Sequence, residues 1–271
     1  MGLIFVARSS SHETPSLFAA SEAENLNRNQ PLPARMRPNR LADFVGQTHF
    51  LHEGSLLRRL IDAKRLGSIL LYGPPGTGKT TLAHLLAIET GSKLKPISAV
   101  TSGVKELREV LEWARNEVSS GAARPVLFVD EIHRFNRAQQ DALLPDVENG
   151  IVSFIGATTS NPFFAINGAL LSRSQIFELK ALSSEDIERL IDRALSDQQH
   201  GLGYLHATIE PDAKAYLAKI VEGDARKALS ALEIAALSAR ERPPRLTRDW
   251  IAESIQTKTI QFDRSGDEHY D

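Results

Sequence analysis

The chain has 271 residues, of which 42% are hydrophobic and 24% charged, and its formal net charge is -2. This composition predicts a globular protein with one large domain, or one domain and a smaller companion, and it provides no global attraction to nucleic acid. The absence of cysteine excludes disulfides, thiolate catalysis and cysteine-ligated zinc. No apolar run approaches the roughly 18 residues that cross a bilayer, so we expect a cytoplasmic protein without a membrane partner.

Residues 1–30 are rich in Ser, Glu and Asn and show no sustained hydrophobic period, which predicts a flexible N-terminal tail. Leu17 and Phe18 form a short apolar pair in this polar segment. Such a pair can dock into a pocket of a partner protein, but it also arises by chance.

Short apolar runs alternate with helical patterns from residue 31 onward. The runs are "SILLYG", "KLKPIS", "PVLFVDE", "VSFIGATT" and "QIFELK". Strands that alternate with helices predict a parallel sheet covered by helices on both faces, which is an α/β fold. We place this domain at residues 31–180.

Only helical patterns follow Lys180. "SSEDIERLIDRAL" opens with serine and an acidic first turn, and "PDAKAYLAKIV" opens with proline, both of which are typical of helix starts. "DARKALSALEIAALSAR" and "TRDWIAESI" continue the pattern. We expect a small all-α domain at residues 181–258 and a C-terminal tail at 259–271.

A glycine-rich loop, "GPPGTGKTT", lies between the first apolar run and a helical pattern. It satisfies GxxxxGK[ST] in the strand-to-helix context that a phosphate-binding loop needs. Glycine lets the backbone surround the phosphates, and the helix N-terminus presents N–H groups to the anion. We expect Lys79 to reach the β and γ phosphates of ATP and the Thr80 hydroxyl to bind Mg²⁺. The predicted binding residues are Gly73, Pro74, Pro75, Gly76, Thr77, Gly78, Lys79, Thr80 and Thr81.

Two acidic residues end the apolar run "PVLFVDE". Asp130 and Glu131 would emerge at the carboxyl end of a buried strand, where open α/β sheets bind ligands. Asp130 would hold Mg²⁺ through water, and Glu131 would polarise the water that attacks the γ-phosphate. This pair predicts hydrolysis in addition to binding.

Polar residues and two arginines complete the candidate site. Thr158, Thr159 or Asn161 in "FIGATTSNPF" could lie beside the γ-phosphate; the spacing does not decide among them, and such residues also form turns. Arg173 precedes the last predicted strand, and Arg226 opens a helix of the second domain. A guanidinium can stabilise transition-state charge, although by pattern alone either arginine reads as a surface residue.

Taken in order, these segments resemble the AAA+ ATPases of the clamp-loader-like branch. The resemblance is closer to the replication-associated recombination protein A family, which is related to the Werner-helicase-interacting ATPases. It runs from about Pro31 to the C-terminus and is carried by "ISAVTSGVKELRE", "DEIHRFNRAQQDALLPDVENG", "FIGATTSNPFFAINGALLSRSQIFEL" and "GDARKALSALE". It implies a P-loop AAA+ sheet followed by a small helical lid.

The resemblance also implies roles for individual residues. Arg173 would be inserted into the site of a neighbouring subunit, so that self-association completes the site. "SRS" stands where relatives often have Ser-Arg-Cys, but the arginine is kept. The chain stops at Asp271, where the helical oligomerisation region of the family would follow, so stable self-association is left open. The implied assignments are Lys79 and Thr80 for Walker A, Asp130 and Glu131 for Walker B, residues 158–161 for sensor 1, Arg226 for sensor 2, and Val45, Gly46 and Gln47 beside the adenine.

The implied function is a DNA-associated ATPase that acts at stalled replication forks, gaps or DNA ends, near the nucleoid. We expect stimulation by single-stranded, gapped or forked DNA, possible strand separation, and contact of the N-terminal tail with a sliding clamp or a single-strand-binding protein. Candidate contacts to the DNA backbone are Arg35, Arg37, Arg40, Lys105 and Arg108.

Two alternatives belong to other classes. "DEIH" also occurs in DExH-type helicases, but these carry two motor domains, and the predicted helical C-terminal part leaves no room for a second one. A chain of this length could instead be an ATP-binding adaptor or switch with little turnover. Nucleotide binding without hydrolysis would indicate the adaptor.

Overall fold

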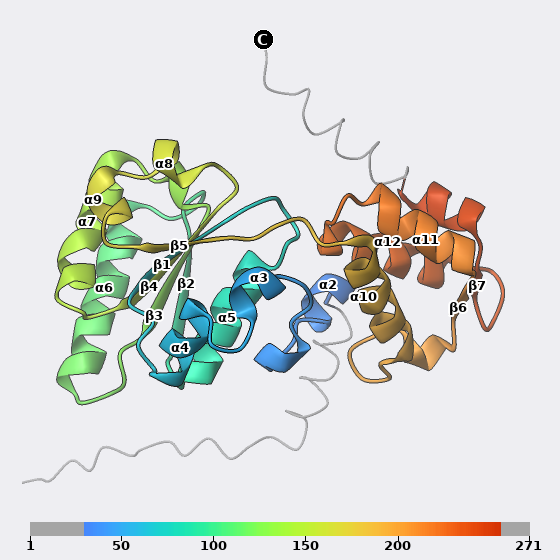
Figure 1. Cartoon of the computed structure of the whole chain (residues 1–271), viewed down its shortest axis with the longest axis horizontal. Helices are drawn as coiled ribbons and strands as arrows, with labels where there is room; N and C mark the ends of the chain where they lie inside the picture. Colours follow the sequence, from blue (N-terminus) through green and yellow to red (C-terminus); the bar gives the residue numbers. More distant parts are fainter. Residues whose placement is uncertain (1–29, 256–271) are drawn as a thin grey trace, which may run out of the picture.

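The computed structural model describes residues 30–255, so the predicted tails, with Leu17 and Phe18, lie outside the described residues except for residue 30. Figure 1 shows a part built on a β-sheet and a part built of helices, side by side. We call residues 46–180 the sheet part and residues 181–255 the helical part. Within the described range, no helix is both long enough and apolar enough to span a membrane.

The sheet part contains five parallel strands in the order β2-β3-β4-β1-β5. β1 lies between β4 and β5, with Tyr72 opposite Thr158, and β4 lies between β1 and β3. Because the strands are parallel, their carboxyl ends meet at one edge of the sheet, and this arrangement confirms the predicted α/β class. The strands are β1 Ser68–Tyr72, β2 Leu94–Ser98, β3 Val126–Asp130, β4 Ser153–Thr158 and β5 Gln175–Glu178.

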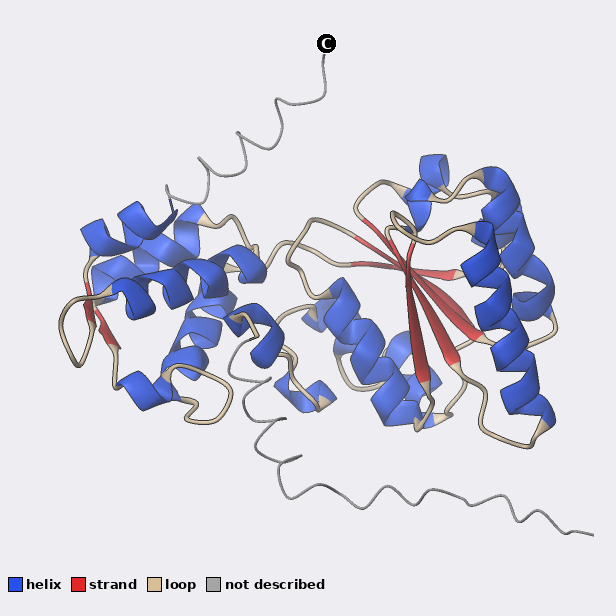
Figure 2. Cartoon of the chain, turned by 180° about the vertical axis from the view of Figure 1, so that it is seen from behind, coloured by secondary structure: helices blue, strands red, loops and turns tan. Residues whose placement is uncertain are grey.

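Helices cover both faces of this sheet (Figures 1 and 2). One apolar cluster lies between the sheet and the helices α4 and α5, and a second lies between the sheet and the helices α6 and α7. The inner strands are buried on both sides, as apolar runs of this kind predict. The helices of the sheet part are α3 Thr48–Leu51, α4 Leu56–Asp62, α5 Lys79–Thr90, α6 Val104–Ser119, α7 Arg137–Glu148, α8 Pro162–Ala165 and α9 Gly168–Leu171, with a 3-10 turn, η2, at Ile132–Arg134.

The helical part packs around one apolar cluster. Ser183 and Asp224 cap α10 and α12 with their side chains, and Pro211 begins α11, as the sequence predicts. Two short parallel strands, β6 and β7, were not predicted, because a strand of two residues has no readable period. The elements are α10 Ser184–Ser196, η3 Gly203–Leu205, β6 Thr208–Ile209, α11 Pro211–Ile220, α12 Ala225–Ser238 and β7 Arg245–Leu246, and residues 248–255 are helical.

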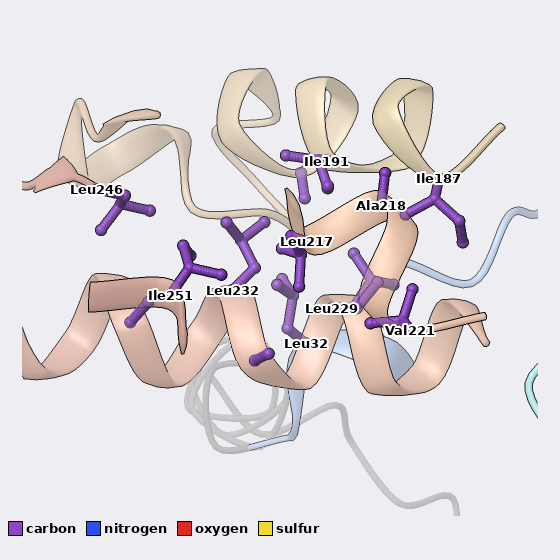
Figure 3. Packing of buried hydrophobic residues seen from close by; sticks show 14 of the residues in the cluster. Leu32, Ile187, Ile191, Leu217, Ala218, Val221, Leu229, Leu232, Leu246 and Ile251 are labelled. Carbon is purple, nitrogen blue, oxygen red and sulfur yellow. The ribbon is translucent and has the colours of Figure 1, made fainter. Parts of the chain in front are cut away.

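The segment before the sheet part packs on the helical part. Helix α2 (Leu32–Arg35) places Leu32 within the helical cluster, where Figure 3 shows it among Leu217, Leu229 and Leu232. The carboxylate of Glu233 on α12 accepts hydrogen bonds from Leu32 N, at 2.9 Å, and from Arg35, at 3.0 Å. The packing of α2 therefore differs from the predicted placement of residue 31 onward with the sheet.

Residues 36–45, which we call the strap, carry the chain from α2 back to the sheet part. They include the 3-10 turn η1 (Leu41–Asp43), in which Leu41 packs in the cluster beneath α5. The Leu41 amide donates to the carboxylate of Glu89 on α5 at 3.2 Å. The strap therefore has one end tied to the helical part through α2 and the other tied to α5.

Candidate functional site

A cavity of about 510 Å³ lies between the sheet part, the helical part and the strap. Its size is that of a typical small-ligand site. The glycine-rich loop, the carboxyl ends of β3 and β4 and the start of α12 contribute its polar wall. The predicted site residues that line it are Val45, Pro75, Gly76, Thr77, Gly78, Lys79, Thr80, Thr81, Asp130, Glu131, Thr159 and Arg226.

The loop between β1 and α5 has a backbone that requires glycine. Gly76 and Gly78 adopt φ values of +70° and +99°, in the left-handed region that side chains disfavour. A Cβ atom on Gly76 would collide with the side chain of Asp224, and one on Gly73 would collide with the carbonyl of Leu179. The glycines therefore serve both the turn and its close contact with the neighbouring elements.

Lys79 begins α5 beneath this loop and is almost completely buried. Its Nζ donates to the carbonyls of Gly73 and Pro74, both at 2.8 Å. Burial lowers the pKa of Lys79, while the charges of Glu131 and Asp130 oppose that shift. Gly73 and Pro74 do not line the cavity; their carbonyls hold the lysine in place.

Asp130 and Glu131 stand at the carboxyl end of β3. Burial, followed by repulsion from Glu131, raises the pKa of Asp130, while the Glu131 N–H donates to Asp130 Oδ1 at 3.1 Å. Glu131 has φ +53°, a left-handed conformation that is uncommon for residues other than glycine. Residues held in such sparsely populated conformations cluster at functional sites. Two carboxylates thus share the cavity with the Lys79 ammonium.

These oxygens fit a hard divalent cation that also binds phosphate. Among the described residues, no group of three or more His, Cys, Asp or Glu side chains could hold a metal. Mg²⁺, however, needs only one or two protein ligands when phosphate and water supply the rest. The Thr80 hydroxyl and the Asp130 carboxylate, both at the cavity, are donors of this kind, and a cation would also relieve the repulsion that raises the pKa of Asp130.

The end of β4 separates the three candidates that the sequence left open. Thr158 is fully buried and engaged with His133 and Ser160. Asn161 caps α8 by accepting from the N–H of Phe163 at 3.0 Å, and it does not line the cavity. Thr159 lines the cavity, and its hydroxyl donates to Glu131 Oε2 at 3.4 Å. The geometry favours Thr159 over Thr158 and Asn161.

The two predicted arginines lie in different places. Arg226, the second residue of α12, lines the cavity, and the adjacent Ala225 N–H donates to the carbonyl of Gly76 at 3.2 Å. Arg173 does not line the cavity of its own chain. It is exposed in the connection from β4 to β5, and its Nε lies 2.6 Å from Oε1 of Glu148. Only Arg226 is brought to the loop within one subunit.

Only the first residue of the segment predicted to border an adenine, residues 45–47, lies at the cavity. Val45 lines the cavity, but Gly46 and Gln47 do not. The buried Gln47 amide accepts from Lys180 N at 2.9 Å and donates to Lys180 O at 2.7 Å. A buried amide needs such partners, and here they lie where the chain leaves the sheet. Gly46 and Gln47 thus lie beside the cavity wall and not in its lining, and their contact with an adenine stays a prediction.

Sequence reasoning missed much of the cavity wall. The strap contributes Arg37 and Phe44, and α10 contributes Arg193, whose guanidinium donates to the carbonyl of Asp43 at 3.1 Å. The aromatic residue directly before the predicted Val45 was an available signal for this wall. The larger apolar residues of this wall include Met36, Phe44, Leu182, Leu190 and Leu229.

Comparison with known proteins places the chain in a family. Residues 69–182 match the family described as "ATPase family associated with various cellular activities (AAA)", and residues 203–271 match the "AAA C-terminal domain". The chain belongs to the AAA family of ATPases. The first match covers the glycine-rich loop and the acidic strand end, and the second covers the helix that carries Arg226.

Two relatives of this AAA ATPase have informative names, one of which refers to replication and recombination. It is 47% identical over 245 residues to "Replication-associated recombination protein A" of Escherichia coli (strain K12), an alignment that covers 89% of this chain and 55% of the relative. It is 39% identical over 259 residues to "ATPase WRNIP1" of Dictyostelium discoideum, covering 89% and 29% of the two chains. The chain spans about half the length of the bacterial relative. These matches confirm the resemblance predicted from the sequence.

A solved structure supports the fold assignment of this AAA ATPase. The Thermotoga maritima RuvB Holliday junction branch migration motor superposes with a TM-score of 0.63 and 27% identity, over 82% of this chain and 73% of RuvB. The parallel sheet, the loop before α5 and the helical C-terminal part are thus an AAA arrangement.

Proposed function

We propose that this AAA ATPase binds MgATP in the cavity, hydrolyses it, and couples the hydrolysis to action on DNA during replication-associated recombination and repair. The observation that carries the proposal is the convergence of Lys79, Thr80, Asp130, Glu131 and Arg226 on one cavity. The name of the bacterial relative supports the DNA part of the proposal.

The phosphate chain of the nucleotide would lie over the loop from Gly73 to Thr80. Lys79 would exchange two carbonyl oxygens, which it already contacts, for phosphate oxygens, so its ammonium needs little movement. Thr80 and Asp130 would hold Mg²⁺, which supplies charge neutralisation at the phosphates. The base would lie against the apolar wall that Phe44 and Val45 begin.

Hydrolysis would depend on Glu131, which lines the cavity beside Thr159. Its carboxylate would accept a hydrogen bond from the attacking water and orient it toward the γ-phosphate. Arg226 would contact the γ-phosphate from the helical part. Loss of that phosphate would remove a contact between α12 and the loop, and such a differential contact can shift the helical part against the sheet.

Arg173 would act on the γ-phosphate of a neighbouring subunit. Its guanidinium is exposed and does not line the cavity of its own chain, so an interface between copies is the arrangement that gives it a catalytic role. We therefore propose self-association across the nucleotide site.

DNA would be contacted by exposed basic residues. Arg37, Arg40, Lys105 and Arg108 are exposed and remain candidates. Arg35 is not one of them, because its side chain is 7% exposed and paired with Glu233. The DNA structure at forks, gaps or ends, stimulation by DNA, strand separation and a clamp or single-strand-binding partner for the N-terminal tail belong to the same proposal. A DNA substrate would place the protein at the nucleoid.

The alternative function is an ATP-binding adaptor or switch with little turnover. Two variants test hydrolysis against it. Lys79→Ala should abolish binding of a fluorescent ATP analogue, whereas Glu131→Gln should bind it like the unmodified protein and lose turnover. If the unmodified protein bound ATP tightly but hydrolysed it no faster than Glu131→Gln, the adaptor would be favoured.

The DExH-helicase hypothesis has no structural support within residues 30–255. These residues contain one five-stranded sheet and the two-stranded β6–β7 pair, and no second motor domain.

A further inference from the structure

His133 contacts the carboxylate that the proposed reaction needs most. It lies two residues after Glu131, in η2, and its side chain is only 16% exposed. Its Nδ1 atom lies 3.2 Å from Glu131 Oε2 and 2.8 Å from Thr158 Oγ1. The imidazole therefore bridges the end of β3 and the end of β4.

The neighbours of Nδ1 determine which ring nitrogen carries the proton. Thr158 Oγ1 lies 3.3 Å from the carbonyl of Ser160, to which its hydroxyl can donate. If Nδ1 carries hydrogen, it donates to Thr158 Oγ1, and the carboxylate oxygen Oε2 of Glu131 lies 3.2 Å from the same nitrogen, beside the positive end of the N–H bond. Without that hydrogen, the Nδ1 lone pair would face the carboxylate. The contacts thus favour hydrogen at Nδ1, bonded to Thr158 and adjacent to Glu131.

Glu131 is held by one of its two carboxylate oxygens. Oε2 receives the contacts from His133 and from the Thr159 hydroxyl. Oε1 makes no hydrogen bond with any residue in the range 30–255 that the structure describes. The left-handed backbone at Glu131 begins η2 and brings the ring back over β4. One oxygen is thus fixed, and the other is available for a water molecule in the cavity.

We propose that His133 is a positioning residue for Glu131. Its Nδ1–H group is fixed by the hydrogen bond to Thr158 and attracts Glu131 Oε2 electrostatically, which restricts the carboxylate to the orientation in which Oε1 can accept a hydrogen bond from the attacking water. Because the same nitrogen contacts Thr158, the carboxylate is also tied to the strand end that places Thr159 in the cavity. The inference deepens the proposed function and rests on the role proposed there for Glu131.

The test is a double-mutant cycle on ATP turnover in the 271-residue chain. His133→Ala should lower kcat about 10- to 100-fold, the scale expected when a reacting group is misplaced by about 1 Å, with the dissociation constant of the fluorescent ATP analogue unchanged. His133→Asn, whose amide keeps a donor near the position of Nδ1, should recover most of the lost turnover. In the Glu131→Gln background, His133→Ala should cause no further loss.

Each contrary result has a distinct meaning. Equal kcat for His133→Ala and the unmodified protein would overturn the positioning role, and so would the same fractional loss in both backgrounds. If the single variant Glu131→Gln kept the kcat of the unmodified protein, the role proposed for Glu131 would be overturned instead. A merely structural role would lower the melting temperature and weaken nucleotide binding together, and His133→Asn would not restore turnover.

A second histidine provides the control. His200 lies in the helical part, away from the cavity lining, and its Nδ1 faces the carboxylate of Asp197 at 3.8 Å. His200→Ala removes a histidine–carboxylate contact of the same kind outside the site. It should leave both kcat and nucleotide affinity unchanged.

Discussion

Arg173 and Glu148 form an ion pair on the surface, with 2.6 Å between Nε and Oε1, and neither residue lines the cavity of its own chain. Both side chains are nearly half exposed, and an ion pair of this kind contributes at most about 1 kcal/mol to stability. The guanidinium also donates to the carbonyl of Ala169 at 2.9 Å. These contacts fix the orientation of Arg173 more than they stabilise the fold.

Subunit mixing tests whether Arg173 acts on a neighbouring site. Arg173→Ala keeps its own carboxylate, and Glu131→Gln keeps its own arginine, so each variant should be inactive alone. An equimolar mixture should regain ATP turnover, because an Arg173→Ala site can receive the arginine of a Glu131→Gln neighbour. If the mixture were no more active than the sum of its components, Arg173 would not contribute to ATP hydrolysis in a neighbouring subunit.

Glu148→Ala should separate orientation of Arg173 from folding. The melting temperature should change little, because the ion pair is exposed. ATP turnover at a fixed protein concentration should fall, but by less than in Arg173→Ala, because the arginine remains and only its restraint is lost. Turnover identical to that of the unmodified protein would show that the ion pair with Glu148 does not orient Arg173 for the reaction.

Arg226 should distinguish ATP from ADP. Removal of a charged hydrogen bond to the γ-phosphate costs about 1.5–3 kcal/mol, which corresponds to roughly a 10- to 100-fold loss of affinity. We therefore expect Arg226→Ala to weaken ATP binding much more than ADP binding. Calorimetric titration in the Glu131→Gln background measures both without turnover. An equal loss for the two nucleotides would mean that Arg226 does not sense the γ-phosphate.

Gly76→Ala tests the contact between the loop and the helical part. The substitution imposes a side chain at φ +70° and drives its Cβ into Asp224. Gly91→Ala is a matched control, because Gly91 has φ +66° with open space around its Cβ position. Backbone strain alone costs about 1 kcal/mol in both variants. Only Gly76→Ala should be destabilised beyond this strain, as measured by thermal unfolding. It alone should also bind nucleotide more weakly, as measured by titration. Equal effects would contradict the collision.

The charged form of Asp130 should destabilise the folded protein in the absence of nucleotide. Burial and Glu131 raise its pKa, so the folded protein binds that proton more tightly than the unfolded chain does. The cost of the charged form is absent below the ordinary pKa of about 4 and is fully present above the raised value. Asp130→Asn should therefore unfold at a higher temperature than the unmodified protein at neutral pH. The difference in unfolding temperature should shrink as the pH falls toward 4, and a difference that grew instead would contradict a raised pKa of Asp130.

The sequence predicts best where a side chain must sit in one particular backbone. Gly76, Gly78 and Lys79 lie where the motif requires, because a phosphate loop leaves few alternatives to glycine and lysine. The strands and the long helices are also predictable, because their burial follows a period. Gln47 and Asn161 behave differently, because their partners, Lys180 and the start of α8, are set by tertiary contacts or local caps that a motif does not specify.

The N-terminal segment shows a second reason for such differences. Arg35 reads as an exposed basic residue in the sequence, but it pairs with Glu233, which is 198 positions away. Leu32 has no helical period around it, yet it is buried in the helical part. Contacts at this separation have no local pattern, so the packing of α2 was not predictable, whereas Phe44, directly before Val45, was a local signal for the strap wall of the cavity.

We propose above that the cavity hydrolyses ATP in a self-associating, DNA-dependent protein. Steady-state ATP hydrolysis by the 271-residue chain tests this over a protein concentration series, with and without single-stranded or gapped duplex DNA, beside Glu131→Gln. We predict turnover that rises more steeply than protein concentration, increases further with DNA, and is lost in Glu131→Gln. Tight ATP binding with turnover no greater than that of Glu131→Gln, at every concentration and with either DNA, would contradict the claim.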